Sequence, residues 1–320
     1  MRPASAPRGA RSVREHLAPA LYFLQVHLLY ATLVCVGALA LTSLRGASVT
    51  AKFWILTTAS LNFALPIGGF IDRFGATDLP GAHQLGPLAA FDLALAQHLT
   101  LAALLCGVWL SGAVLMLLRL CLRVISERRE ELGRDRSGAP DLYVHGVPVH
   151  FIAGRCSPAV GGMVRTHICL PRGIERLLNG RELDAVLLHE VTHAKRRDNL
   201  LRLLHEFAQC VLWFHPLLWL TGGRLALYRE LSCDESVLTV NGGRFLVSAL
   251  AKLARPESSF VLRSGATSLV SHRLERLLAP AVPGENRLLN GAMVVAFSVL
   301  LLSGVFLTVA HTACCLVPVG

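Results

Sequence analysis

One short stretch of the sequence carries residue types that could bind a metal ion and use it: His189-Glu190-Val191-Thr192-His193. The apolar residues around the stretch predict a helix, in which two histidines four positions apart lie on one face. Both imidazoles can then reach one metal ion. Glu190 points in another direction, which leaves its carboxylate free to activate a water molecule. The stretch therefore predicts a hydrolytic zinc site.

A catalytic zinc ion needs a third protein ligand and an open fourth position. The best candidate is Glu230, which lies one helical turn before Asp234. One carboxylate can then bind the metal while the other positions a ligand. Because ligating histidines usually donate their second N–H to a carboxylate, we expect Asp234 to contact His189. The alternative is that Glu230 and Asp234 only form salt bridges on a solvated helix.

Several nearby residues have weaker claims on the site. Tyr228, Arg229 and His215 are candidate donors to the substrate carbonyl, although each could equally anchor the chain at the membrane or pack in the core. Cys233 is a rival soft ligand, but it lies off the face of Glu230 and is interpreted as a small buried hydrophobe. The pair His205-Glu206 repeats the start of the motif, but Gln209 stands where the second histidine should be.

Other histidines and cysteines are interpreted as structural. Three histidines in the predicted strands are expected at the surface or at sheet edges: His145, His150 and His167. Cys156 and Cys169 could pair across a turn, but we do not expect a disulfide in a reducing cytoplasm.

The elements around the motif follow from its flanks. Residues 141–170 alternate in polarity, are rich in β-branched residues and are interrupted by Gly and Pro, which predicts two or three short strands. A long helix is expected from about Glu182, with Asn179 as its N-cap. These strands could bind a substrate as an added edge strand, which gives weak sequence specificity.

The composition places this polar region inside a membrane protein. The chain has 320 residues, of which 53% are hydrophobic and 16% charged, and its mean hydropathy is +0.52. This excludes a disordered chain, and nine cysteines are too sparse for a disulfide scaffold. Residues 123–287 hold 40 of the 52 charged residues. Because the arginines alternate with acids or flank apolar runs, we expect contact with membrane lipid and no direct nucleic-acid binding.

Four apolar runs are candidate membrane spans: residues 21–44, 53–71, 99–122 and 288–309. The second is weaker, because it contains several polar residues and Pro66. Arginines at both ends of the polar region predict that it faces the cytoplasm of a bacterial inner membrane. Whether residues 53–71 cross, and hence which side holds the N-terminus, stays open. Residues 211–220 are rich in Trp and Leu and are expected to dip into the bilayer surface.

Taken together, the motifs show a resemblance to a known family. The zinc motif with Lys195-Arg196-Arg197-Asp198-Asn199 after it, Trp213-Phe214-His215-Pro216-Leu217, and Arg229-Glu230-Leu231-Ser232-Cys233-Asp234 resemble the membrane metallopeptidases of beta-lactam sensor-transducers. Two further segments are similar to that family: Ser157-Pro158-Ala159-Val160-Gly161 leading to Ile168-Cys169-Leu170-Pro171, and Ser271-His272-Arg273-Leu274-Glu275-Arg276-Leu277-Leu278.

The resemblance implies a gluzincin-type site. His189, His193 and Glu230 would bind zinc, Glu190 would be the general base, and Asp234 would orient a ligand. The family's sensors cut themselves and trigger the loss of a repressor. Few residues follow the last apolar run, so we expect no extracellular penicillin-binding domain.

The sequence thus predicts an α-helical membrane protein with an inserted α+β gluzincin-type zinc metallopeptidase domain. The expected parts are an N-terminal membrane region (1–122), a cytoplasmic peptidase domain (123–287) and a C-terminal span with a short tail (288–320). The expected activity is a zinc endopeptidase in regulatory proteolysis, with one Zn²⁺ per chain. Its substrate would be a protein or peptide, including the chain itself or a transcriptional repressor. The alternative is a non-catalytic signalling or scaffold protein with structural zinc.

Overall fold

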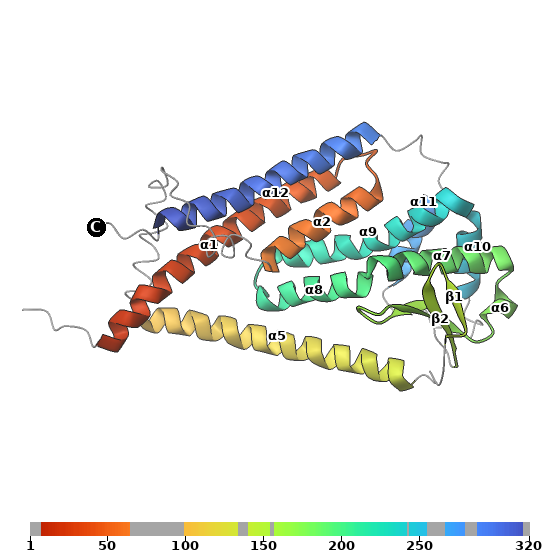
Figure 1. The fold of residues 1–320 in the computed structure, drawn as a ribbon, viewed down its shortest axis with the longest axis horizontal. Helices are drawn as coiled ribbons and strands as arrows, with labels where there is room; N and C mark the ends of the chain where they lie inside the picture. The colour runs from red at the N-terminus through yellow and green to blue at the C-terminus, as the bar shows by residue number, and fades with distance from the viewer. Residues whose placement is uncertain are drawn as a thin grey trace, which may run out of the picture.

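The computed structural model describes residues 8–64, 99–133, 140–153, 157–241, 243–254, 266–278 and 287–315. The described chain is mostly helical, with one small sheet (Figure 1). The helices are α1 (Arg8–Thr42), α2 (Val49–Ala64), α5 (Leu99–Gly133), α6 (Ile174–Leu177), α7 (Gly180–Arg196), α8 (Asp198–Val211), α9 (Pro216–Asn241), α10 (Arg244–Leu253), α11 (Ala266–Leu278) and α12 (Arg287–Cys315). The strands are β1 (Leu142–Val144), β2 (Val147–Ile152), β3 (Ala159–Gly161) and β4 (His167–Pro171).

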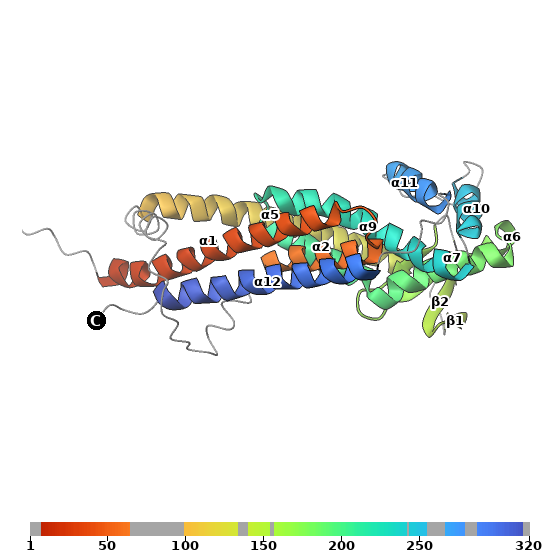
Figure 2. The same cartoon turned by 90° about the horizontal axis from the view of Figure 1, so that it is seen from above.

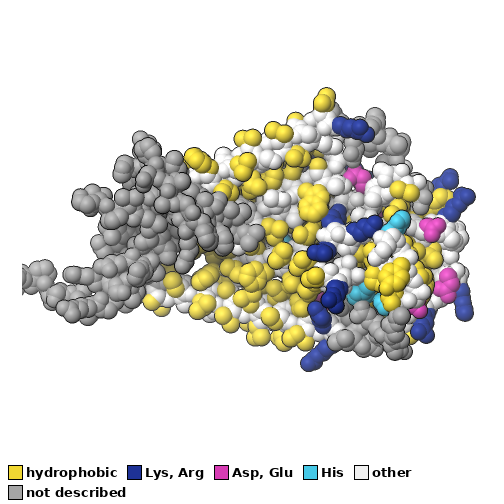
Figure 3. Space-filling model, in the orientation of Figure 1, with side chains coloured by type: hydrophobic (Ala, Val, Ile, Leu, Met, Phe, Trp, Pro, Cys, Tyr) yellow, Lys and Arg dark blue, Asp and Glu magenta, His cyan; other side chains and the backbone are white. Residues whose placement is uncertain are grey.

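The molecule is elongated and has two unlike ends (Figures 1 and 2). At one end α1, α2, α5 and α12 form a bundle with the α8–α9 hairpin, and at the other the sheet is packed with α6, α7, α10 and α11. Figure 3 shows hydrophobic side chains over the surface of the bundle, whereas charged side chains gather toward the sheet. This separation agrees with the concentration of charge in residues 123–287.

Three helices of the described chain are long and apolar enough to cross a membrane: α1 over Leu24–Thr42, α5 over Ala103–Arg129 and α12 over Arg287–Leu307. They coincide with three of the four apolar runs. The second run, residues 53–71, differs. Its described part belongs to α2, which has 16 residues and buries much of its surface against α1, α8 and α9. Residues 65–71 of the run lie outside the described residues, so whether this run crosses the membrane stays open.

The sheet has four strands rather than two or three, in the order β1-β2-β4-β3. β2 and β4 pair in parallel, and the two outer strands pair antiparallel to them. One face packs on α7, where Val149, Ile168 and Leu170 meet Val186 and other apolar residues in the largest buried cluster among the described residues. This core fixes the helix that carries the His-Glu-x-x-His motif.

The start of α7 confirms the predicted cap. Asn179 accepts a hydrogen bond from the Glu182 backbone N–H, and the Glu182 carboxylate accepts one from the Asn179 N–H. This reciprocal arrangement satisfies two N–H groups that the helix itself leaves unpaired. The helix ends at Arg196. Its C-cap, Arg197, has a left-handed φ of 56°, and α8 starts at the next residue. The turn changes the direction of the chain directly after the second motif histidine.

The α8–α9 hairpin packs against two candidate spans. At its tip, Trp213 Nε1 donates to the carbonyl of Trp109 on α5, and Trp109 Nε1 donates to the carbonyl of Val211. Gly112 permits this close approach, because a Cβ there would lie 2.5 Å from the Trp213 ring. On α1, Thr32 Oγ1 lies 3.0 Å from His215 Nε2. The tip therefore lies beside residues inside the spans of α1 and α5.

Candidate metal centre

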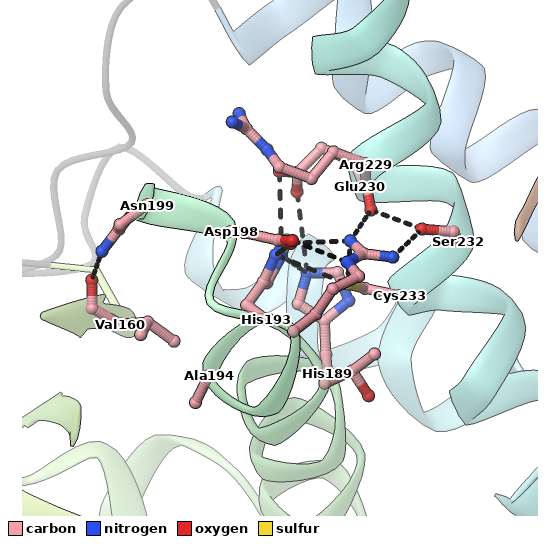
Figure 4. Close-up of polar contacts among 12 residues, drawn as sticks. Val160, His189, His193, Ala194, Asp198, Asn199, Arg229, Glu230, Ser232 and Cys233 are labelled. Carbon is pink, nitrogen blue, oxygen red and sulfur yellow. Dashed lines mark hydrogen bonds and ion pairs between the residues drawn. The ribbon is translucent and has the colours of Figure 1, made fainter. Parts of the chain in front are cut away.

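α7 and α9 bring His189, His193 and Glu230 together, as the sequence predicted. The Nε2 atoms of the two histidines lie 3.1 Å apart. Glu230 Oε2 lies 3.6 Å from His189 Nε2, and Oε1 lies 3.8 Å from His193 Nε2. Figure 4 shows the two histidines rising from one turn of α7 toward Glu230.

These distances suit a tetrahedral metal ion. Zinc ligands at about 2.0–2.1 Å from the metal stand about 3.4 Å from one another in a tetrahedron. The observed separations of 3.1, 3.6 and 3.8 Å bracket that value. The surrounding charge also favours a cation. Burial and the charge of Arg273 lower the pKa of His189, but its hydrogen bonds to Asp234 and Glu230 outweigh them and raise this pKa to about 9.

Asp234 lies where the sequence placed it. Its Oδ1 is 3.0 Å from His189 Nδ1, so the carboxylate can hold the ring with Nε2 turned to the metal position. Asp234 is buried. Burial alone would raise its pKa, but His189 and Arg273 lower it below the usual value.

Asp198 does for His193 what Asp234 does for His189, and the sequence reasoning assigned it no role. Its Oδ2 lies 2.6 Å from His193 Nδ1. Arg196 holds the same carboxylate through Nε and Nη2, each at 2.6 Å. Asp198 has this position because the left-handed Arg197 turns the chain back on itself. A signal was present, since Asp198 belongs to the segment that resembles the family.

Arg273 on α11 is the second residue that the sequence reasoning missed. It donates from Nε and Nη2 to the two oxygens of Asp234, both at 2.8 Å. Its Nη1 also lies 3.4 Å from Glu230 Oε2. The sequence treated Arg273 as one of the arginines before the last span. One further indication of a role at the site was present in the sequence, because Arg273 lies in the segment 271–278 that is similar to the family.

A second group of possible ligands overlaps the first: His193, Asp198 and Cys233. Two observations disfavour it as the metal site. The His193 nitrogen that faces this group is the Nδ1 already held by Asp198. Burial raises the pKa of the Cys233 thiol well above its ordinary value, so the thiolate that metals prefer is disfavoured.

Glu190 is half-buried beside His189. Within the described part of the chain, no hydrogen bond or ion pair engages its carboxylate, in contrast with Asp198 and Asp234. The Glu190 carboxylate is therefore free to accept a proton.

The three candidate donors to the substrate carbonyl lie in different parts of the structure. Arg229 lies at the site, with Nε 3.6 Å from Glu230 Oε1. Tyr228 instead packs with residues of α1 and α12, and its hydroxyl donates to the Thr42 carbonyl at 3.4 Å. His215 lies at the hairpin tip against Thr32 and Phe63. Only Arg229 of the three is near the metal ligands.

The strand histidines stand apart from the group. His145 is exposed in a turn, and His150 is half-buried on β2. His167 is buried on the inner strand β4, so the prediction of a surface or edge position was wrong for it. The possible partner of Cys169, Cys156, lies outside the described residues.

Comparison with known proteins identifies the family. Residues 82–277 match the family model described as BlaR1 peptidase M56, which covers more than half of the chain. The protein belongs to this family. It is therefore a membrane protein of a signal-transducing metallopeptidase family, which confirms the resemblance seen in the motifs.

Two kinds of curated relative are similar to part of the chain. The regulatory protein BlaR1 of Bacillus licheniformis is 38% identical over 82 residues, which is 26% of this chain and 14% of the relative. The methicillin resistance mecR1 proteins of Staphylococcus aureus and Staphylococcus epidermidis are 26% identical over 99 residues, which is 31% of this chain and 17% of the relatives. The matched stretch thus spans less than a fifth of these relatives' lengths.

Proposed function

We propose that this protein is a zinc-dependent endopeptidase of regulatory proteolysis, with a gluzincin-type centre formed by His189, His193 and Glu230. The observation that carries the proposal is the spacing of their ligand atoms, 3.1–3.8 Å, with Glu190 unengaged beside them. When bound, zinc polarises the substrate carbonyl and makes water acidic enough to lose a proton near neutral pH.

The chain's own residues supply the rest. The Glu190 carboxylate accepts the proton from the attacking water and passes it to the leaving amine. Asp234 and Asp198 accept from Nδ1 of the two histidines and keep each Nε2 lone pair free for the metal. Arg273 fixes Asp234 from the other side. Arg229 is the candidate donor to the substrate carbonyl oxygen.

The sheet offers a place for the peptide backbone. β3 is an edge strand of the sheet and packs on α7. Asn199 donates to the Val160 and Gly162 carbonyls, as Figure 4 shows for Val160, and Thr166 donates to the Ala194 carbonyl. These bonds hold the edge strand against the end of the metal-binding helix. We propose that an extended substrate segment pairs there, taken from the chain itself, a repressor or another membrane protein.

The centre lies close to the bilayer in this proposal. The chain has 17 consecutive residues without Lys, Arg, Asp or Glu between Glu206 and Arg224, too few for two crossings. They form the end of the α8–α9 hairpin, whose tip packs on α1 and α5. We propose that this hairpin enters the bilayer from the side that holds the sheet and returns. We propose that this side faces the cytoplasm of a bacterial inner membrane, because arginines follow the apolar part of α5 there and membrane proteins keep such residues on the cytoplasmic side.

The test is Glu190→Gln in the full chain, purified in lipid nanodiscs. We expect bound zinc to stay at the wild-type level and cleavage of casein or of the chain itself to fall about 10³-fold. Cleavage at the wild-type rate with zinc retained would refute the mechanism. No cleavage by the zinc-loaded wild type, under conditions in which it binds peptide, would favour a scaffold with structural zinc.

A further inference from the structure

A cavity lies along the α8–α9 hairpin and reaches toward the metal group. It has a volume of about 340 Å³ and lies between α2, α8 and α9. At one end it is lined by Asp198 and Arg229, whose side chains lie 2.6 Å from His193 Nδ1 and 3.6 Å from Glu230 Oε1. Along α8 its lining continues to Gln209, about 16 Å farther at the helical rise per residue. The cavity thus reaches two residues that contact the metal ligands.

The charged groups along this cavity already have partners. Arg202 pairs with Glu127 at 2.9 Å, and Glu206 pairs with Arg123. Asp198 is held by Arg196 and His193. Arg229 at the mouth lies 3.6 Å from Glu230 Oε1. Beyond the mouth, a further charge brought into the cavity would find no unpaired opposite charge, whereas the walls offer Phe53, Leu61, Leu225 and other apolar side chains. The lining therefore favours an uncharged occupant with an apolar stem.

His205 gives the cavity a polar wall, and the nearest acceptor to its ring is the Leu218 carbonyl. The residue is 8% exposed, and neither ring nitrogen makes a hydrogen bond of ordinary geometry within the described chain. The neighbouring Leu218 carbonyl already accepts from Gln209 and Thr221. A neutral imidazole carries one donor and one acceptor, and buried polar atoms are almost always paired. An occupant with a hydrogen-bonding group would complete this wall.

Gly222 keeps the space at His205 open. A Cβ at this position would lie 2.9 Å from Gln209 Nε2 and 3.1 Å from His205 Nε2. The adjacent Gly223 also lines the cavity, but a Cβ there would meet no described atom within 4 Å. The two glycines therefore provide a matched pair of alanine substitutions on one helix.

We propose that this cavity, the α8–α9 pocket, is a specificity subsite for a long uncharged side chain with a hydrogen-bonding tip, such as tyrosine or glutamine, on a residue beside the cleaved bond. The inference rests on the proposed peptidase function. Asp198 and Arg229 place the mouth of the pocket at the metal ligands, the apolar wall receives the stem, and His205 pairs with the tip. Phenylalanine would leave His205 unpaired, and lysine or arginine would bring an uncompensated charge.

The test compares tyrosine with phenylalanine. Cleavage sites in a peptide mixture are first mapped by mass spectrometry with zinc-loaded protein in nanodiscs, and matched peptides with Tyr or Phe beside the bond are then made. We expect wild type to prefer Tyr about tenfold in kcat/KM. Gly222→Ala and His205→Phe should reduce the ratio to about one, while Gly223→Ala keeps it.

A binding measurement separates the pocket from the peptidase function. Fluorescence anisotropy of the same labelled peptides on the Glu190→Gln protein should show a similar tenfold preference, again lost with Gly222→Ala. Equal use of Tyr and Phe by wild type, or a preference unchanged by Gly222→Ala, would overturn the pocket and leave proteolysis standing. If wild type cleaves no peptide of the mixture, labelled members of that mixture with Tyr or Phe at one matched position are used for binding instead, and a tenfold preference for Tyr that Gly222→Ala abolishes would support the pocket and refute the peptidase function.

Discussion

The His189-Glu190 pair on α7 and the His205-Glu206 pair on α8 have the same two residues in the same order, but their surroundings differ. His189 has a second histidine one turn later, a carboxylate at Nδ1 and another facing Nε2. His205 has Gln209 one turn later, and both its ring nitrogens lack an ordinary hydrogen bond in the described chain.

The glutamates of the two pairs, Glu190 and Glu206, also differ in their contacts. Glu206 pairs with Arg123 and ties α8 to α5, whereas no described residue engages the Glu190 carboxylate. A His-Glu pair on a helix therefore does not make a metal centre by itself. The neighbouring helices make the difference. α9 brings Glu230 and Asp234 to the His189-Glu190 pair, whereas no carboxylate of another described helix contacts His205.

The largest effects are expected from changing the residue that follows each His-Glu pair by one helical turn, which is His193 on α7 and Gln209 on α8. His193→Ala should remove the zinc and reduce peptidase activity about 10³-fold, because two ligands do not hold the ion. Gln209→His creates a second His-Glu-x-x-His sequence on α8, yet zinc should stay at one per chain. Metal analysis of the two purified variants checks both. A second zinc in the Gln209→His protein would show that the motif alone is sufficient.

A smaller effect is expected from Asp198, the residue that has no counterpart beside His205. Asp198→Asn removes the carboxylate at His193 Nδ1 and should weaken zinc binding by about 10- to 100-fold. A competition titration with a zinc chelator measures the change. Asp184→Asn, exposed on α7, is the control and should bind zinc as wild type does. Equal affinities for the two variants would remove Asp198 from the account.

Arg273 gives a comparison within one helix. Arg273→Lys keeps the charge but loses the two-point contact with Asp234, and lysine cannot replace that geometry. Zinc affinity should fall by about tenfold, and the pH profile of cleavage should shift as His189 loses its fixed orientation. Arg276→Lys, whose partner is Glu235, should leave both unchanged. If Arg273→Lys lowers the stability of the protein but leaves the pH profile of cleavage unchanged, Arg273 has only a structural role.

The sequence could predict two pairs of candidate site residues because their spacing is local: one helical turn separates His189 from His193 and Glu230 from Asp234. It could not predict Arg273, because the position of α11 depends on how distant helices pack. Asp198 was missed for a different reason, since the left-handed turn at Arg197 overrides helical spacing. The sheet was predicted as a region, but three-residue strands such as β1 and β3 are too short to show a period.

The smallest predicted effect concerns the anchoring of α7. Burial would raise the pKa of Glu182, but Lys252, Ser248 and the Asn179 N–H lower it to about 2 from 4.5. The stabilisation is therefore complete above pH 4.5 and is lost as the pH falls toward 2. In wild type the free energy of unfolding should fall by about 1–2 kcal/mol over this pH range because of Glu182, and in Glu182→Gln this part of the fall should be absent. Thermal unfolding followed by circular dichroism measures the difference. Glu175→Gln, exposed on α6, should keep the wild-type pH dependence, and identical profiles for both variants would contradict the assignment.

The central claim is that a metal ion sits between α7 and α9, held by His189, His193 and Glu230. X-ray absorption at the zinc edge on the full chain in nanodiscs tests it directly. We predict one zinc per chain, with only nitrogen and oxygen neighbours at about 2.0–2.1 Å, and loss of one oxygen neighbour or of the zinc in Glu230→Ala. A sulfur neighbour at about 2.3 Å would instead place the ion at His193, Asp198 and Cys233, and would contradict the account.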